Sequence, residues 1–493
     1  MSFSIISIRQ LASWQAREGT ILIDLREREE YQEEHIKGAV NIPYERWEQE
    51  KEGWRHQFTY LIFYCDRGNQ SMYAAREMNR LGYHVASIAG GFESYRIWKK
   101  KGKKGTLEKK STMGKEIFEL IAPCHFGMEA VLKREINDLG YEISKVENGK
   151  VTFLADAEGI CRGNIFLRTT ERILLKVAEF KAETFDELFE ACKAIPWEHY
   201  IPENGKFWVA KATSVNSKLF SPSDIQRIVK KAMVESLKRT YRVSWFAEDG
   251  ASYPLRINIM KDIVTVSLDT TGVSLHKRGY RRYTAPAPVT ETLAAAMLLL
   301  SPWKKDRILV DPFCGSGTIP IEAAMIACRI APGLNREFLS EEWDNLIPKK
   351  EWYGVVEEAQ DMVCEDAEVQ IQGYDIDDEV LKMARANAVL AGVEDKIHFQ
   401  RRDIINFSSP KKYGFVVSNP PYGERLSDKK QMEMLYRSIG QIIKENDTWS
   451  FFLLSGYEEA QKMIGKKADK NRKIYNGMMK TYLYQYMGIK PPR

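Results

Sequence analysis

Cysteine is scarce in this 493-residue sequence, and long apolar segments are absent. The seven cysteines form no C-x-x-C pair, which argues against a disulfide framework and against a structural zinc site. The histidines are scattered at no metal-ligand spacing, so we expect no metal site. The longest apolar run, residues 293–300, is far shorter than the roughly 20 residues of a membrane-spanning helix. The first residues also lack the regions of a signal peptide, so we expect a cytoplasmic protein with no membrane partner.

The composition is that of a globular protein. Hydrophobic residues make up 44% of the sequence and charged residues 29%, which excludes a disordered acidic or basic chain. At roughly 100–200 residues per domain, the length predicts about three or four domains. The net charge of +5 comes from 73 basic and 68 acidic residues. This weak excess of positive charge permits nucleic-acid binding but does not demonstrate it.

A lysine-rich linker at residues 99–114 divides the chain, because it has no core-forming pattern. Before the linker, apolar segments predict strands, and they are separated by a segment with helical spacing. The predicted elements are strands at 20–24, 60–64 and 84–88, and a helix at 72–82. Residues 1–98 are therefore predicted to form a small α/β domain.

After the linker, the sequence predicts an α+β region and then a doubly wound α/β domain. In the α+β region we expect helices at 127–139 and 223–241, a strand at 150–154, and a hairpin of 257–260 with 263–268 that turns at Lys261 and Asp262. From residue 284 onward we expect strands at 307–311, 371–375, 397–403 and 413–418, with helices at 319–331 and 378–391. The fold class is thus an α/β multidomain protein, with a parallel doubly wound sheet at its C-terminal end.

A glycine-rich turn follows the first strand of the doubly wound domain. Gly315 and Gly317 let backbone N–H groups approach a ligand beside a helix N-terminus. The third glycine of a dinucleotide fingerprint and the G-K-[ST] of a P-loop are missing, which disfavours NAD and ATP.

Acidic residues end the next two strands of this domain. Asp375 could accept hydrogen bonds from both hydroxyls of a ribose, and Asp403 suits the 6-amino group of an adenine. The structural alternative for Asp375 is to cap the helix at 378–391, and Asp377 is the better candidate for that role.

The strongest chemical signal is Asn419-Pro420-Pro421-Tyr422, at the end of the fourth predicted strand. The exocyclic amine of a base is a poor nucleophile, because its lone pair is delocalised into the ring. The side-chain oxygen of Asn419 and the carbonyl of Pro420 could accept hydrogen bonds from that amine and stabilise its developing positive charge. Two prolines stiffen the loop, and Tyr422 offers a ring for stacking on an extruded base.

A mixture of cations and aromatic rings precedes this domain. Residues 276–283 interleave four cations with two tyrosines, which suits contacts to phosphates and bases. The RNA-binding residues predicted from this stretch are Lys277, Arg278, Tyr280, Arg281 and Arg282. The structural alternative is a solvated surface.

Five stretches carry a resemblance to a known family: 275–281, 287–296, 311–318, 373–377 and 419–426. In them the chain resembles the class I S-adenosylmethionine-dependent methyltransferases, and more narrowly the THUMP-domain RNA methyltransferases of the 23S rRNA guanine-N2 type. The resemblance covers about 115–490 and implies a ferredoxin-like segment at 115–168, a THUMP domain at 169–283 and a methyltransferase domain at 284–493. It implies S-adenosylmethionine as cofactor, bound by Asp311, Gly315, Gly317, Asp375 and Asp403, with residues 419–422 on the target base.

Cys65 opens a second candidate site in the N-terminal domain. The loop from Cys65 to Ser71 lies between a strand and a helix, so its N–H groups could stabilise a thiolate or a persulfide. The structural alternative is a buried cysteine. With residues 24–26, 34–43 and 89–92, this domain resembles a single-domain rhodanese, which implies that Cys65 carries sulfur. The family often ends the loop with arginine where this chain has Gln70, and Asp24 and His35 look structural.

Several functions remain open at this stage. The target is an amino group of rRNA or of tRNA, and guanine N2 and adenine N6 share the same tetrapeptide. A role in tRNA sulfuration would need an S-G-G-x-D-S loop, which is absent. A non-catalytic RNA-binding protein would not need Asp375, Asp403 and Asn419, and the THUMP-like region favours RNA over DNA. No motif identifies a sulfur donor for the rhodanese part.

Overall fold

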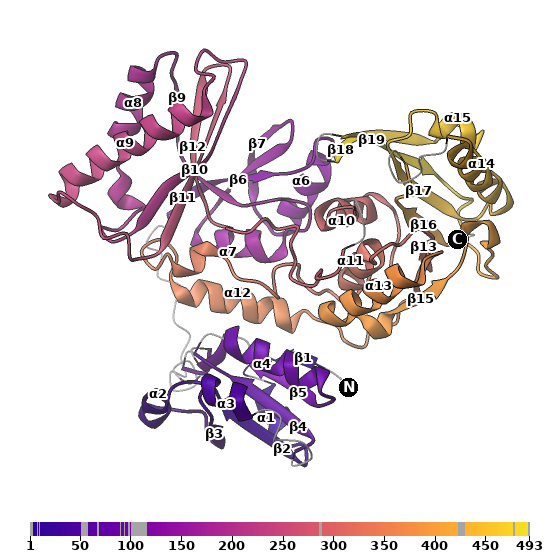
Figure 1. The fold of residues 1–493 in the computed structure, drawn as a ribbon, viewed down its shortest axis with the longest axis horizontal. Coiled ribbons are helices and arrows are strands. Elements are labelled where there is room, and N and C mark those ends of the chain that lie inside the picture. The colour runs from indigo at the N-terminus through magenta and orange to yellow at the C-terminus, as the bar shows by residue number, and fades with distance from the viewer. Residues whose placement is uncertain are drawn as a thin grey trace. The chain divides into compact units, whose positions relative to one another are not determined.

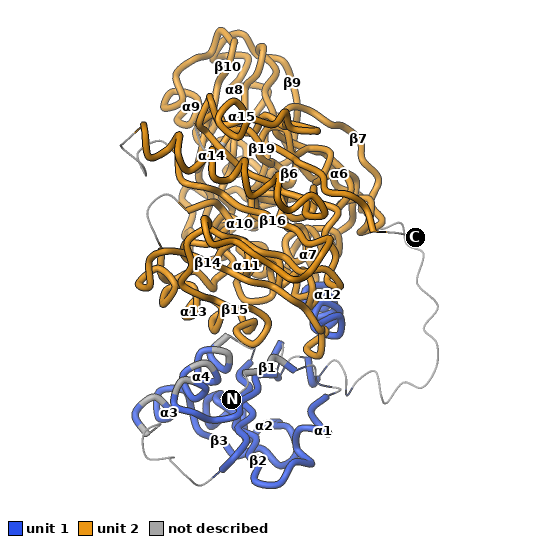
Figure 2. The backbone as a smooth tube through the Cα atoms, turned by 90° about the vertical axis from the view of Figure 1, so that its right-hand side faces the viewer, with its two compact units in different colours: residues 1–115, 349–363 blue, residues 116–348, 364–493 orange. Residues whose placement is uncertain are grey.

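The computed structural model describes residues 3–6, 8, 10–50, 58–66, 69–88, 90–92, 94–96, 99, 116–284, 288–422, 429–476 and 479–491. Contacts group the chain into two compact units, drawn in blue and orange in Figure 2. The first is Met1–Lys115 with Lys349–Val363, and the second is Glu116–Pro348 with Cys364–Arg493. In the parts of the chain that the structure describes, none of the helices combines the length and the apolar character that a membrane crossing requires.

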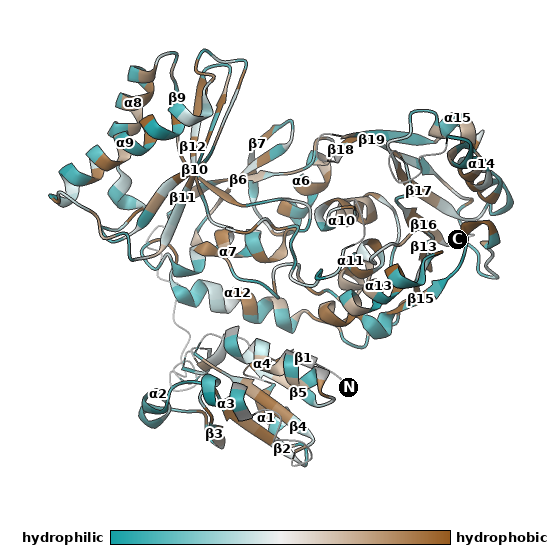
Figure 3. Cartoon of the chain, viewed as in Figure 1, coloured by the Kyte–Doolittle hydropathy of each residue, from teal (hydrophilic) through white to brown (hydrophobic). Residues whose placement is uncertain are grey.

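The first unit contains a five-stranded parallel sheet in the order β1-β5-β4-β2-β3. Its strands are strongly hydrophobic (Figure 3), because a parallel sheet buries both faces. Leu22 and Ile62 pack on one face, and Ile23 and Phe63 pack on the other. The elements of this unit are β1 (Phe3–Ile6), α1 (Leu11–Gln15), β2 (Thr20–Asp24), α2 (Arg28–Glu33), β3 (Ala39–Asn41), α3 (Tyr44–Glu50), β4 (Tyr60–Tyr64), α4 (Asn69–Arg80), β5 (His84–Ile88) and α12 (Lys349–Asp361).

The three strands predicted in the N-terminal domain are confirmed as β2, β4 and β5. The predicted helix at 72–82 is confirmed as α4, which begins three residues earlier. The sequence reading missed β1 and β3. Both lie at the edges of the sheet and are only three or four residues long, so they carry little hydrophobic pattern.

The second unit begins with a seven-stranded sheet in the order β10-β11-β12-β9-β6-β8-β7. This sheet joins the predicted ferredoxin-like and THUMP segments, because β6 of the former pairs with β9 of the latter. The helices α8 and α9 pack together, and α9 packs on β10 (Figure 1). Its elements are β6 (Phe118–Pro123), α6 (Glu129–Asp138), β7 (Glu142–Glu147), β8 (Lys150–Ala155), α7 (Ala157–Phe166), β9 (Leu174–Lys181), α8 (Phe185–Ala194), β10 (Lys206–Val215), α9 (Pro222–Tyr241), β11 (Ser252–Met260) and β12 (Ile263–Asp269).

Local signals in this sheet are confirmed closely. The predicted hairpin is β11 with β12, and both turn residues have a positive φ, 51° at Lys261 and 62° at Asp262. Two left-handed residues are what a two-residue hairpin turn requires. The helix α9 begins after Ser221, whose side chain accepts a hydrogen bond from the N–H of Asp224. The domain limits proposed from the sequence stay predictions.

The second unit ends in another seven-stranded sheet, in the order β15-β14-β13-β16-β17-β19-β18. Helices α14 and α15 cover one face with a core that includes Tyr436 and Ile439, and α11 and α13 pack on β13, β14 and β15. The elements are α10 (Glu291–Leu300), β13 (Leu309–Asp311), α11 (Thr318–Ala327), β14 (Ile371–Asp375), α13 (Asp378–Ala391), β15 (Ile397–Arg401), β16 (Phe415–Ser418), α14 (Lys429–Glu445), β17 (Ser450–Ser455), α15 (Ala460–Ile464), β18 (Lys470–Asn476) and β19 (Met479–Tyr486).

The predicted parallel pairing holds for the five strands β13 to β17 and is wrong at β19, the one strand of this sheet, among the described residues, that runs in the opposite direction. The strand β19 runs antiparallel to both β17 and β18. The reason is that β18 and β19 follow each other with only two residues between them, and so short a connection can join only antiparallel strands.

Two helix glycines make a matched pair for testing the packing of α14 on α15. A Cβ on Gly440 would lie 2.1 Å from the carbonyl oxygen of Ile464 in α15, whereas a Cβ on Gly354 in α12 would meet open space. We expect Gly440→Ala to lower the free energy of unfolding by about 1–3 kcal/mol or more. Gly354→Ala should raise it by roughly 0.5–1 kcal/mol. Denaturant titration measures both, and equal effects would contradict the close helix contact.

Candidate active site

The central position of β13 gathers the candidate site residues at one edge of the sheet. The strand β13 pairs in parallel with β14 on one side and with β16 on the other. Its end, Asp311, therefore lies beside the ends of strands that lead into Asp375 and Asn419. The chain order of the strands reverses between β13 and β16, which is where open α/β sheets bind ligands.

The glycine-rich turn is fixed by backbone contacts to β14. The N–H of Cys314 donates to the carbonyl of Tyr374 at 2.9 Å, and the N–H of Gly315 donates to Asp375 Oδ2 at 3.0 Å. Gly315 and Gly317 have positive φ angles of 53° and 88°. A Cβ on Gly317 would lie 3.1 Å from Cβ of Ala384, so packing also demands glycine there. A Cβ on Gly315 would meet no atom within 4 Å, which leaves space beside the turn.

The carboxylate of Asp375 holds the turn and does not cap the following helix. Besides the N–H of Gly315, it accepts a hydrogen bond from the N–H of Asp377 at 3.2 Å. Burial raises the pKa of Asp375. The cap of α13 is Asp377, whose side chain accepts from the N–H of Glu379 at 2.9 Å. This confirms the expectation that Asp377 serves as the cap, and it leaves Asp375 available at the sheet edge.

Asp311 is almost fully buried beneath the turn. Its Oδ1 accepts hydrogen bonds from the hydroxyl of Ser418 and from the N–H of Phe313. Burial raises the pKa of Asp311 to about 7. The side chain of Ser418 thus links the ends of β13 and β16 through a carboxyl group that titrates near neutral pH.

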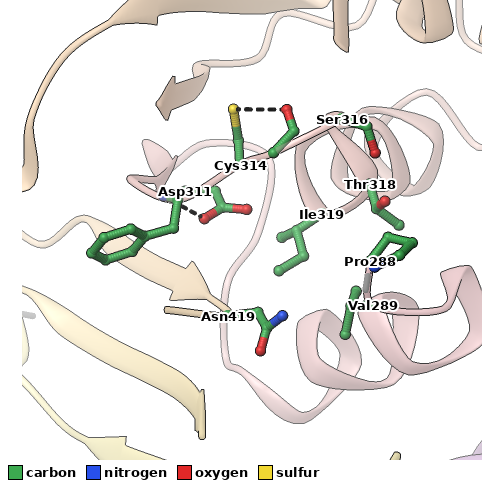
Figure 4. Close-up of a pocket in the computed structure, with 10 residues that line it drawn as sticks. Pro288, Val289, Asp311, Cys314, Ser316, Thr318, Ile319 and Asn419 are labelled. Atoms are coloured by element: carbon green, nitrogen blue, oxygen red, sulfur yellow. Dashed lines mark hydrogen bonds between the residues drawn. The ribbon is translucent and has the colours of Figure 1, made fainter. Parts of the chain in front are cut away.

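A pocket opens between the glycine turn, α11 and Asn419 (Figure 4). The Asn419 side chain points into the same space as Val289 and Ile319. Its Oδ1 is buried and has no hydrogen-bond partner among the described residues, and the same holds for Oγ of Ser316. Buried acceptors without a partner cost free energy, so these oxygens mark positions where a ligand could donate hydrogen bonds. The lining residues are Pro288, Val289, Asp311, Phe313, Cys314, Gly315, Ser316, Thr318, Ile319 and Asn419.

The pocket unites only part of the predicted site. Asp311, Gly315 and Asn419 line it, and Asp375 reaches it through the N–H of Gly315. Asp403 is exposed beyond the end of β15, where its carboxylate accepts from the N–H of Ile405 at 3.0 Å. The assignment of Asp403 to an adenine stays a prediction.

The rest of the tetrapeptide turns toward the protein interior. Pro420 is buried and Pro421 is half-buried. Tyr422 is 9% exposed, and a Cβ on Gly456 would lie 2.9 Å from its ring. Its role in stacking on a base stays a prediction. The last four residues of the family stretch 419–426 lie outside the described residues.

The structure contradicts most of the RNA contacts predicted in residues 276–283. Arg278 and Tyr280 are each 2% exposed, and both bond to Glu322 Oε1 on α11, at 3.5 Å and 3.1 Å. Arg281 is mostly buried in an ion pair with Glu291 at 2.7 Å. Their assignment to RNA is therefore wrong, because each makes contacts inside the protein. The remaining two, Lys277 and Arg282, are exposed.

Sequence reasoning gave no role to several residues that shape the pocket. Pro288 and Val289 form part of its wall, and Ser316 contributes a buried hydroxyl. The available signal was the Ala-Pro-Val-Thr-Glu stretch before α10, which carried the family resemblance without an assigned role.

Cys65 follows β4 directly and is 3% exposed. Its Sγ lies 3.7 Å from Oγ of Ser71, and its carbonyl accepts from the N–H of Phe92 at 2.8 Å. A Cβ on Gly91 would lie 2.1 Å from that carbonyl, so the backbone approaches the cysteine closely. The one cation in the sequence of the loop from Cys65 to Ser71, Arg67, lies outside the described residues, and the anion-binding role of this loop stays a prediction.

The expectation that Asp24 is structural is confirmed, because its buried carboxylate pairs with Arg26 at 2.7 Å. Arg26 in turn donates to the carbonyl of Glu34 at 2.8 Å, so the pair braces two loops. His35 is exposed and stacks on Tyr31 with ring centroids 4.0 Å apart.

Comparison with known families matches four successive parts of the chain. The rhodanese-like domain model matches residues 7–97, and the RlmL ferredoxin-like domain model matches 119–174. The THUMP domain model matches 182–269, and the RMKL-like methyltransferase domain model matches 278–485.

Three relatives illustrate the similarity. YpsC of Bacillus subtilis (strain 168), named as an RNA methyltransferase, is 48% identical over 379 residues, which are 76% of this chain and 98% of that protein. The ribosomal RNA large subunit methyltransferase K/L of Syntrophotalea carbinolica is 33% identical over 385 residues, 73% of this chain and 52% of that protein. The chain thus spans about half the length of that relative. The solved structure of SMU.472, described as a methyltransferase complexed with SAH, is 42% identical, has a TM-score of 0.73, and is matched over 77% of this chain and 100% of its own. The chain therefore belongs to the RMKL-like RNA methyltransferases with ferredoxin-like and THUMP domains, here combined with a rhodanese-like domain.

Proposed function

We propose that this protein transfers a methyl group from S-adenosylmethionine to an exocyclic amine of an RNA base, with guanine N2 of 23S rRNA as the target. The observation that carries the proposal is the Oδ1 of Asn419, a buried acceptor in a pocket beside the glycine turn, to which none of the residues that the structure describes donates a hydrogen bond. The relative from Syntrophotalea carbinolica is named for ribosomal RNA of the large subunit, which supports this RNA class. A target in tRNA, at guanine N2 or adenine N6, is the alternative.

The residues around the pocket fit S-adenosylmethionine. The open space beside Gly315 and the unpaired Oγ of Ser316 would accommodate the methionine moiety, with Asp311 near its ammonium group. Asp375 would hold the ribose, since it lies at the end of β14 with its carboxylate beside the turn. Asp403 would hold the adenine. The related SMU.472 is complexed with SAH, the product of this cofactor, which supports the assignment. When bound, the cofactor supplies an activated methyl group on a positively charged sulfur.

Asn419 would make the base amine reactive. Its Oδ1 and the carbonyl of Pro420 would each accept one N–H of the amine, which localises the nitrogen lone pair and stabilises the positive charge that develops on nitrogen. Because Pro420 and Pro421 limit backbone motion, both acceptors are in place before the base arrives. Of the predicted cations, the exposed Lys277 and Arg282 would contact RNA phosphates.

A second activity is proposed for the rhodanese-like domain, in which Cys65 directly follows the buried parallel strand β4 and precedes α4. The Cys65 thiolate would attack the sulfane sulfur of a donor such as thiosulfate, form a persulfide and release sulfite. The persulfide sulfur would then pass to a nucleophilic acceptor.

The principal test is methylation of unmodified rRNA and of unmodified tRNA in separate reactions with S-adenosylmethionine, followed by mass spectrometry of the nucleosides. We expect N2-methylguanosine in rRNA. Asn419→Ala should lower the rate by about 10²–10³-fold, because one preorganised acceptor is lost. Asn446→Ala is a control amide at the end of α14, and it should leave the rate unchanged. Methyladenosine as product would refute the guanine assignment, and full activity of Asn419→Ala would refute the role of Asn419.

Asp311 should give cofactor binding a pH dependence. Its carboxyl group is protonated below its pKa of about 7, whereas the ammonium group of SAH keeps its charge. The ionised form attracts that ammonium group, so affinity should fall several-fold as the pH decreases through about 7. Calorimetric titration of SAH at about pH 8 and about pH 6 measures the change. Asn at position 311 carries no charge, so Asp311→Asn should bind SAH weakly at both pH values. If the wild-type affinity for SAH were the same at both pH values, Asp311 would not be the group that attracts the ammonium.

The rhodanese proposal predicts conversion of cyanide to thiocyanate in the presence of thiosulfate. Cys65→Ser should abolish this conversion and leave RNA methylation intact, because Cys65 belongs to a different compact unit from Asn419. Cys192→Ser alters another buried cysteine and should retain both activities. Thiocyanate formation by Cys65→Ser at the wild-type rate would rule out this cysteine as the sulfur carrier.

A further inference from the structure

The side chain of Asn387 forms hydrogen bonds both to the glycine turn and to residues 282–283, which precede the pocket residues Pro288 and Val289. Asn387 lies in the middle of α13 and is fully buried. Its Nδ2 donates to the carbonyl of Ser316 at 3.1 Å and to the carbonyl of Tyr283 at 2.9 Å. Its Oδ1 accepts from the N–H groups of Arg282 and Tyr283, both at 3.3 Å. A carboxamide has two N–H donors and one oxygen with two lone pairs, so all its bonding capacity is used.

The bond to Ser316 fixes the plane of one peptide group in the turn. The carbonyl of Ser316 accepts from Asn387, and the N–H of Gly317 in the same peptide donates to the carbonyl of Cys314 at 2.9 Å. A peptide group is planar, so bonds at both ends determine its orientation. That orientation also determines where the backbone carries Ser316 Oγ, one of the unpaired oxygens in the pocket.

The other bonds of Asn387 fix the backbone under two exposed side chains. Arg282 and Tyr283 are exposed, and the Tyr283 residue is 51% accessible. The segment before them is held by Arg278 and Tyr280, which bond to Glu322 of α11. The helix α11 begins directly after the glycine turn. Two buried polar groups, Asn387 and Glu322, therefore hold residues 278–283 against the turn and its helix.

We propose that Asn387 is a positioning residue for the cofactor site, which locks the glycine turn and the backbone of residues 282–283 into one geometry. The inference rests on the proposed function, since it assigns the turn to the cofactor. Asn387 touches no residue that reacts. It acts through Ser316 on the cofactor side and through Arg282 and Tyr283 on the side that faces solvent. No apolar side chain could replace it, because four backbone groups, the carbonyls of Ser316 and Tyr283 and the N–H groups of Arg282 and Tyr283, would lose a partner inside the protein.

The variant Asn387→Asp tests this role at almost constant volume. One carboxylate oxygen can still accept from the N–H groups of residues 282 and 283. The other oxygen replaces the NH2 donor and would repel the carbonyl oxygens of Ser316 and Tyr283. We expect the dissociation constant for SAH, measured by calorimetric titration, to rise at least tenfold. In methylation kinetics, KM for S-adenosylmethionine should rise by a similar factor, while kcat at saturating cofactor should fall less than threefold.

Asn164 offers a matched control in α7. It is equally buried, its Nδ2 donates to the carbonyl of Ile160 at 3.0 Å and to Oγ1 of Thr270 at 2.9 Å, and its Oδ1 accepts from Thr271 at 2.6 Å. None of these three hydrogen-bond partners belongs to the described residues that line the pocket. Asn164→Asp should lower Tm as much as Asn387→Asp and leave SAH affinity within twofold of wild type.

The outcomes separate this inference from the proposed function. A wild-type chain that fails to bind SAH would refute the cofactor assignment itself. Wild-type affinity in folded Asn387→Asp, or equal losses of affinity in the Asn387 and Asn164 variants, would overturn the positioning role alone. If Asn387→Asp does not fold, Asn387→Ser decides, since its hydroxyl keeps one donor. A loss of SAH affinity at unchanged kcat would support the inference, and unchanged affinity would refute it.

Discussion

The parallel pairing of β13 with β14 on one side and with β16 on the other is the constraint on which the candidate site depends. It brings three segments that are far apart in the sequence to one sheet edge, where Asp311 and Asp375 end their strands and Asn419 directly follows its strand. Hydrogen bonds then join neighbouring strand ends, from Ser418 to Asp311 and from Gly315 to Asp375. The strand order of the sheet therefore determines where the pocket lies, and the loops after the strands supply the residues that line it.

Polar side chains, some fully and some partly buried, connect this sheet to the ferredoxin-like and THUMP segments. The carboxylate of Glu171 accepts from His276 at 2.8 Å and from the hydroxyl of Thr292 on α10, and it pairs with His125 at 3.5 Å. These contacts hold its pKa far below the usual range and raise the pKa of His125. Together with the hydrogen bonds of Arg278 and Tyr280 to Glu322, they join the ferredoxin-like and THUMP segments to the domain that forms the pocket.

Local patterns in the sequence predicted the helices and strands well. They could not predict side-chain contacts between residues that are far apart in the sequence. Buried strands such as 20–24 and 371–375 were predicted because apolar runs and turn residues mark them. Asp311 and Asn419 were predicted as site residues because they lie at or just after the carboxyl ends of such strands, where ligands bind in open α/β sheets. The burial of Arg278 and Tyr280 could not be read, because their partner Glu322 is more than 40 residues away and a basic run resembles a solvated surface. Asn387 gave no signal either, since one amide within a helical pattern looks like an ordinary surface residue.

Cys314 lines the same pocket as Asn419, and this position has a chemical consequence for the protein itself. A thiolate beside an activated methyl group would compete with any base for alkylation. Burial raises the pKa of Cys314 well above its usual range, so the group remains a neutral thiol, which is a poor nucleophile. If S-adenosylmethionine binds here as proposed, a neutral Cys314 thiol would compete poorly with a base for its methyl group.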